Sequence, residues 1–147
     1  MEKKNITDLL ERLLEVIKIS RKGYKDAAEQ VKDPVLQTRF NQYTQQRNIY
    51  MEKLSSMVTQ NGGTPGDAES FEGNMMRMWI DFKSGLIGHD NAKIIDQCLK
   101  EEQNTLIEFD NALKEELPDS IKNILGSMDE EIKKSYQQLQ EFRQQYN

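Results

Sequence analysis

Cysteine and histidine are almost absent from this sequence, which contains one of each, Cys98 and His89. One cysteine excludes an intramolecular disulfide and a cysteine-based zinc cluster, and it fits a reducing cytoplasm best. The chain also lacks a glycine-rich phosphate loop, a Ser-His-Asp set and histidines at metal-ligand spacing. We therefore expect a cytoplasmic protein that is not an enzyme and carries no cofactor.

Long apolar runs and clusters of basic residues are missing as well. No window is apolar enough to span a membrane, and Asp8, Glu11 and Glu15 interrupt the apolar residues of the N-terminus, which argues against a signal peptide. The net charge is −5, and no run of Lys or Arg offers the clustered positive surface that nucleic-acid phosphates require. Neither a membrane nor a nucleic acid is an expected partner.

What the sequence does contain is typical of helices. Of its 147 residues, 31% are charged and 36% hydrophobic, with only 8 Gly and 3 Pro. Apolar residues recur three or four positions apart, and no stretch alternates like a strand. We predict one all-α domain, residues 1–147, which is long enough to bury a core. Its helices are expected at about 7–31, 34–61, 71–87, 90–116 and 119–145.

Turn residues mark the ends of these helices. Asp33-Pro34 reads as a capping residue followed by the first helical position, so the first two helices form a tight antiparallel hairpin. Gly62 or Gly63 can close the second helix in the left-handed conformation, and Asp90 can cap the helix that follows the crossover. Two hairpins joined by a crossover with a short helix make an up-down four-helix bundle of the ferritin-like type.

Arg47 interrupts the apolar face of the second helix. Tyr43 lies four residues before it and Tyr50 three residues after it, so its side chain falls in line with residues that should be buried. This face as a whole is made by Leu36, Phe40, Tyr43, Arg47, Tyr50, Leu54 and Met57.

Several segments, in their order along the chain, resemble a bacterial ferritin-like four-helix-bundle family of unknown function. They are GYKDAAEQVKDPVLQTRF, QQRNIYMEKL, the GG-TP loop, MWIDFK, EEQNTLIEFDNAL and LP. This resemblance covers essentially the whole chain and implies a distant relationship to rubrerythrin and bacterioferritin.

The resemblance also implies where metal ligands would stand. Ferritin-like di-iron proteins use a glutamate from each of two helices and a Glu-x-x-His from each of the other two. In this chain the matching positions hold Ile17 in the first helix, Arg47 and Tyr50 in the second, Glu102 in the third and Glu131 in the fourth, where Lys134 stands in place of the histidine. The di-iron site is therefore expected to be lost, with Glu102 and Glu131 as weak metal candidates.

We predict that the Arg47 guanidinium instead lies buried at the centre of the bundle. It would pair there with Glu102, or also with Glu131, while the Tyr50 or Tyr24 hydroxyls complete the hydrogen bonds. The alternative is that the Arg47 stem covers apolar surface and its head reaches water.

Three functions follow as hypotheses. The first is a non-enzymatic bundle protein with a structural, interaction or stress-related role, in which an Arg–Glu network replaces the di-iron centre. The second is a weak iron-binding redox or storage protein, and the third holds a small apolar ligand between its helices. Cys98 is expected to be a buried structural thiol. Met75, Met76, Met78 and Trp79 are expected to form the inner face of the crossover helix, with a partner-binding surface as the alternative. A homodimer or a protein partner is a further hypothesis, because Phe71, this methionine cluster and Tyr146 do not all have obvious cover within one chain.

Overall fold

The computed structural model describes residues 2–66, 82–84, 86, 88 and 90–146. Within the expected short helix at 71–87, residues 82–84 and 86 are helical. The predictions made for Phe71, the Met75–Met78 segment and Trp79 fall outside the described residues.

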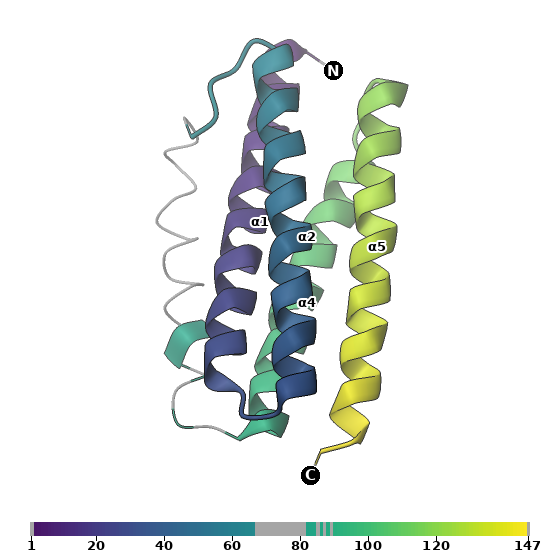
Figure 1. Ribbon diagram of the computed structural model, residues 1–147. Helices are drawn as coiled ribbons and strands as arrows, with labels where there is room; N and C mark the ends of the chain where they lie inside the picture. Colours follow the sequence, from purple (N-terminus) through teal and green to yellow (C-terminus); the bar gives the residue numbers. More distant parts are fainter. Residues whose placement is uncertain (1, 67–81, 85, 87, 89, 147) are drawn as a thin grey trace.

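Four long helices make up the bundle (Figure 1), and the described residues contain no strand. They are α1 (Lys3–Gln30), α2 (Pro34–Gln60), α4 (Asn91–Leu113) and α5 (Asp119–Gln144). The first helix begins at Lys3, earlier than the predicted Thr7. Apolar periodicity could not predict this first turn, because its residues are exposed. The α4 helix ends at Leu113, earlier than expected.

The helices follow one another as two antiparallel hairpins. In Figure 1, α1 descends, α2 rises, α4 rises and α5 descends. Each of α1 and α5 packs against both α2 and α4, so α2 and α4 occupy diagonal corners. This is the bundle with one long connection that the sequence predicted.

The predicted helix caps are present. The Asp33 side chain accepts a hydrogen bond from the Val35 backbone amide at 2.9 Å, with Pro34 as the first helical residue. Asp90 accepts from the Lys93 amide at 3.0 Å. After α2, Gly62 takes a φ of +85°, which only glycine adopts without strain. These caps fix the lengths of the helices and hence the register of their buried faces.

Tyr146, the residue before the last, is partly covered within the chain. Its side chain packs partly against the core, and its hydroxyl donates a hydrogen bond to the second carboxylate oxygen of Asp33. The Arg143 guanidinium donates to Asp96 and to the Tyr146 carbonyl. The last turn of α5 is thereby tied to the α1–α2 connection and to α4.

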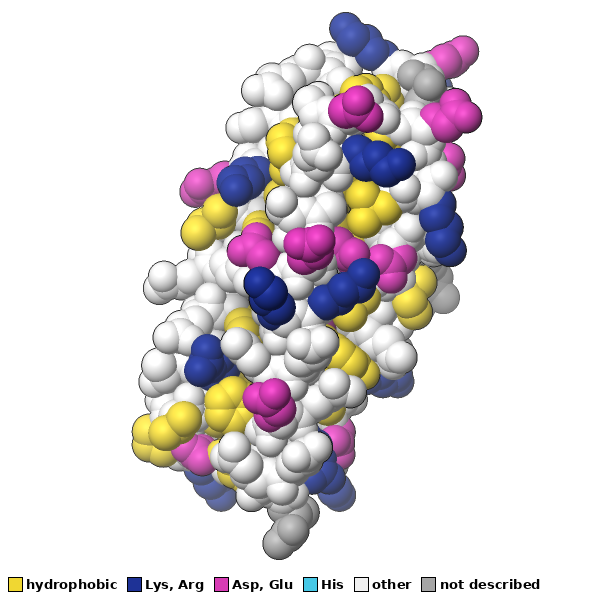
Figure 2. Space-filling model, turned by 90° about the vertical axis from the view of Figure 1, so that its right-hand side faces the viewer, with side chains coloured by type: hydrophobic (Ala, Val, Ile, Leu, Met, Phe, Trp, Pro, Cys, Tyr) yellow, Lys and Arg dark blue, Asp and Glu magenta, His cyan; other side chains and the backbone are white. Residues whose placement is uncertain are grey.

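The outer surface mixes charges of both signs. Figure 2 shows acidic side chains gathered at mid-height on the face that lies to the right in Figure 1, with basic side chains directly beside them. Hydrophobic side chains are scattered between these charges, as on an ordinary solvated face. None of the described helices combines the length and the apolar character needed to cross a membrane.

Candidate functional site

The core is divided by a layer of polar side chains at mid-height. One apolar cluster surrounds Leu10, Leu54 and Leu125, and a second surrounds Phe40, Ile95 and Leu139. Between them along the four helices lie buried polar residues, one or two from each helix: Ser20 of α1, Arg47 of α2, Glu102 and Thr105 of α4, and Ser135 of α5. Buried polar groups are stable only when they are hydrogen-bonded, so this layer is the candidate site.

Arg47 and Glu102 form an ion pair across the diagonal of the bundle. The Arg47 Nη1 atom lies 2.8 Å from Glu102 Oε1, and Nη2 lies 2.8 Å from Oε2. Both side chains are 0% exposed. The planar fork of the guanidinium matches the carboxylate with two parallel hydrogen bonds, which is the strong form of this pair.

Two further residues accept hydrogen bonds from Arg47. Nη1 also donates to the Ser20 hydroxyl at 2.6 Å, and Nε donates to the Gln46 side-chain oxygen at 3.1 Å. Arg47 therefore makes four hydrogen bonds, of the five that a guanidinium can donate. A buried arginine needs this degree of satisfaction, because each unpaired buried donor costs free energy.

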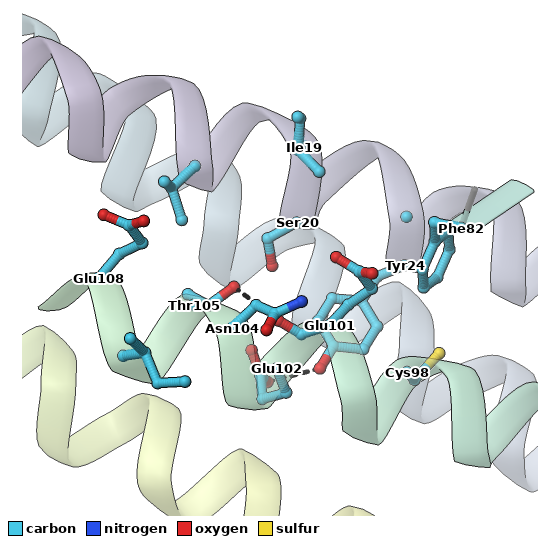
Figure 3. A pocket seen from close by; sticks show the side chains of 13 residues that line it. Ile19, Ser20, Tyr24, Phe82, Cys98, Glu101, Glu102, Asn104, Thr105 and Glu108 are labelled. Atoms are coloured by element: carbon cyan, nitrogen blue, oxygen red, sulfur yellow. Dashed lines mark hydrogen bonds between the residues drawn. The ribbon is translucent and has the colours of Figure 1, made fainter. Parts of the chain in front are cut away.

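Tyrosine rings enclose the ion pair. The Tyr24 hydroxyl donates to Glu102 Oε2 at 2.5 Å, as Figure 3 shows, and the Tyr24 ring centre lies 5.3 Å from Arg47 Cζ. The Tyr50 ring centre lies 5.9 Å from the same atom. Both rings lie within the range of cation–π attraction.

The sequence offered the hydroxyl of Tyr50 or of Tyr24 to the ion pair, and that of Tyr24 makes the hydrogen bond. The Tyr50 hydroxyl is buried and makes no hydrogen bond with Arg47 or Glu102. Tyr50 contributes its ring to the network, whereas Tyr24 contributes both ring and hydroxyl. The difference arises because Glu102 faces Tyr24 across the α1–α4 contact and already holds Arg47 with both oxygens.

The structure also places the other site residues that the sequence singled out. Arg47 does not reach water, so the alternative of a solvent-seeking head group is wrong. Glu131 is exposed and is not part of the ion pair. Ile17 is fully buried in the apolar core, and Cys98 is a buried free thiol. The structure thus brings Arg47, Glu102 and Tyr24 together and leaves Glu131 outside.

Burial sets the electrostatics of the layer. Burial by itself lowers the pKa of Arg47, but the charge and hydrogen bonds of Glu102, together with Tyr24 and Tyr50, raise it above its ordinary value, so the guanidinium stays protonated. Burial, with the Glu102 charge added, raises the pKa of Tyr24 well above its ordinary value. Burial followed by the charge of Glu131 raises the pKa of Tyr50. None of these groups is poised to exchange a proton near neutral pH, as a general acid or base would be.

Two members of the network, Ser20 and Gln46, did not emerge from the sequence. Ser20 lies three residues after Ile17 and four before Tyr24, so it is a polar residue on the buried face of α1, and that spacing was a usable signal. Gln46 adjoins Arg47 in sequence and is half-buried. No pattern distinguishes it from the other glutamines of α2.

The residues of the layer do not fit a di-iron centre. Both oxygens of Glu102 already accept hydrogen bonds, and a permanent positive charge stands within 2.8 Å of them. A metal cation at this carboxylate would face direct repulsion from the guanidinium. In the parts of the chain that the structure describes, no three His, Cys, Asp or Glu side chains are grouped so that they could hold a metal ion.

Comparison with known proteins agrees with this architecture. The chain is similar in structure to a two-domain protein from Anabaena variabilis that contains DJ-1/ThiJ/PfpI-like and ferritin-like domains, with a TM-score of 0.82 at 19% sequence identity. The match covers 99% of this chain and 40% of the Anabaena protein, so the chain spans less than half the length of that relative. No curated protein matches the chain.

The fold is therefore an all-α ferritin-like bundle, as the sequence predicted. Residues 5–115, which include α2, α4, all but the first two residues of α1 and most of the buried polar layer, match the family described as "Domain of unknown function (DUF2383)". The chain belongs to this ferritin-like helical family of unknown function.

Proposed function

We propose that this protein is a non-enzymatic ferritin-like bundle in which the Arg47–Glu102 pair takes the place of a di-iron centre. The observation that carries this proposal is the pairing of both guanidinium nitrogens with both carboxylate oxygens at zero exposure. A positive group now occupies the space between helices where the wider superfamily binds cations. The bundle would then act as a structural or interaction protein, for example under stress, through its outer surface.

This role requires no redox or acid–base chemistry from the layer. Ser20, Tyr24 and Gln46 complete the hydrogen bonds of the ion pair, and they fix the positions of α1, α2 and α4 relative to one another. A protein partner or a second copy of the chain would bind the rigid outer surface that results. Support comes from the guanidinium, which makes four of its five possible hydrogen bonds, because a network of this kind specifies one helix register.

Metal analysis tests the proposal. The purified protein should contain no stoichiometric metal, and titration with ferrous iron in air should produce no saturable ferric absorbance. The Arg47→Met variant removes the guanidinium, and Arg12→Met serves as a matched control because Arg12 forms a similar pair with Glu108 on the surface. Stoichiometric iron in the wild-type protein, with an absorbance that develops on oxidation, would establish the alternative of an iron redox or storage protein.

A further inference from the structure

A cavity of about 280 Å³ lies beside the polar layer, between α1 and α4 (Figure 3). Its apolar wall includes Val16 and Ile19 of α1 and Phe82 of the crossover. Its inner end is formed by Ser20, Tyr24 and Glu102, which also belong to the ion-pair network.

The size of the cavity suits a small organic molecule. A protein cavity of about 150 Å³ is enough to hold benzene, and pockets for drug-sized ligands begin at about 300 Å³. The apolar side chains would cover the body of a ring or of a short alkyl chain. A molecule with one ring and a short substituent therefore fits this space better than a sugar, a nucleotide or a peptide.

Ser20 provides one free hydrogen-bond donor at the inner end. Its oxygen accepts from Arg47 Nη1, so its own hydrogen must point elsewhere, and no acceptor for that hydrogen is found among the described residues. The side chain is buried, and Figure 3 shows the hydroxyl projecting from α1 toward α4. A ligand atom that accepts a hydrogen bond would satisfy this donor.

The charges around the cavity exclude an anion. Glu101, Glu102 and Glu108 all line it, whereas no Lys or Arg does among the described residues. The guanidinium groups of Arg47 and Arg12 are each already paired, with Glu102 and Glu108. A carboxylate or phosphate ligand would therefore find no unpaired Lys or Arg on the described lining of the cavity.

We propose that this cavity binds a small, neutral, mainly apolar molecule that carries one hydrogen-bond acceptor, such as an alcohol or a ketone. The apolar body lies against Val16, Ile19 and Phe82, and the acceptor oxygen faces the Ser20 hydroxyl. This site is additional to the role of the ion pair and does not depend on whether the protein binds metal.

Three probes of similar shape test the proposal: benzyl alcohol, ethylbenzene and benzoate. Benzyl alcohol differs from ethylbenzene only in an OH in place of a methyl group, so the pair isolates the hydrogen bond. We expect benzyl alcohol to shift the backbone amide resonances of Gly23, Asn104 and Thr105, with a dissociation constant on the order of 1 mM or below. Ethylbenzene should bind more weakly and benzoate should cause no saturable shift.

Two variants locate the contact. Ser20→Ala should weaken benzyl alcohol binding about fivefold, the value of one ordinary hydrogen bond, and leave ethylbenzene binding unchanged. Ile19→Trp should fill the cavity and abolish binding of both, whereas Ile124→Trp on the exposed side of α5 should not. Far-ultraviolet circular dichroism checks that each variant is folded.

Several results would overturn the proposal. One is that benzoate binds as tightly as benzyl alcohol. Another is that Ser20→Ala lowers the affinity for benzyl alcohol and for ethylbenzene equally. A third is that no probe causes saturable shifts in the wild-type protein. Retained binding of both neutral probes in folded Ile19→Trp would also overturn it.

Discussion

Arg47 and Glu102 stand on helices at diagonal corners of the bundle, and their side chains meet at its centre with two hydrogen bonds of 2.8 Å each. The backbones of α2 and α4 do not approach each other closely, so the long side chains of this ion pair span the diagonal. The same chain offers a natural comparison, because Arg12 and Glu108 form a similar two-bond pair between α1 and α4 at the surface.

Removing one partner of the buried pair should be strongly destabilising. Arg47→Met leaves Glu102 as an unpaired buried charge, and we expect the free energy of unfolding to fall by about 3–5 kcal/mol. Arg12→Met, whose guanidinium is 53% exposed, should cost less than about 1 kcal/mol. Urea unfolding followed by circular dichroism measures both.

The double variant Arg47→Met/Glu102→Leu gives the corresponding control. Replacing both charges by apolar groups should recover most of the lost stability, because neither charge then remains buried without a partner. A loss in Arg47→Met that is no larger than in Arg12→Met would show that the central pair is open to water.

Stability should decline at alkaline pH because of the buried tyrosines. In the unfolded chain a tyrosine ionises near its ordinary pKa of 10.0, whereas burial raises the pKa of Tyr24, Tyr43 and Tyr50 in the folded protein. Above that pH the folded state holds protons that the unfolded state has released, so the free energy of unfolding falls as pH rises through this window.

Spectrophotometric titration checks this expectation. The tyrosinate absorbance of Tyr24 should develop together with the loss of helical circular dichroism. Tyr146, whose pKa is about 12, lies near the surface, so its ionisation should not require unfolding. In Tyr24→Phe the steepness of the alkaline transition should decrease. Full ionisation of all five tyrosines near pH 10 without loss of helix would contradict the prediction.

Gly23 should resist replacement despite its position within a helix. A Cβ atom there would lie 3.0 Å from Phe82 Cε1, so Gly23→Ala forces the Phe82 ring to move and should destabilise the protein. Gly126 in α5 has nothing within 4 Å of such an atom, and Gly126→Ala should stabilise by about 0.5–1 kcal/mol.

Making Gly23→Ala in a Phe82→Ala background tests whether the Phe82 ring causes the loss of stability. Without the ring, Gly23→Ala should become neutral or stabilising, as ordinary helix propensity requires. Thermal unfolding of the four combinations gives the coupling between the two sites. Equal effects of Gly23→Ala in both backgrounds would exclude the contact with Phe82 as the reason.

The Cys98 thiol should be inert in the folded protein. Burial, and after it the charges of Glu102 and Glu101, raises its pKa well above the ordinary value, which disfavours the reactive thiolate. Its reaction with a disulfide reagent should therefore be limited by the rate at which the bundle opens and exposes the thiol, and urea should accelerate it. Cys98→Ser/Ser127→Cys, with the thiol on the exposed face of α5, should react at once. Equally fast reaction of the wild-type protein would contradict the burial.

The sequence predicted much of the fold and part of the site. Apolar spacing and turn residues such as Asp33-Pro34 and Gly62 predict the helices and their order, because these are local properties of the backbone. The apolar spacing around Arg47 also placed a charge on a buried face. It could not show whether the guanidinium reaches water, because a long side chain can leave the face on which its Cα lies.

The choice of partners was decided by the tertiary structure. The composition and the periodicity of this chain determine an all-α bundle and supply Arg47, Glu102 and Tyr24 on its inner faces. Only the packing of the helices selects Ser20 and Gln46 as further acceptors, leaves Glu131 at the surface and keeps the Tyr50 hydroxyl out of the ion pair. The physical reason is that helical periodicity fixes the direction of each side chain from its own axis, whereas a hydrogen bond between helices depends on their relative rotation and height.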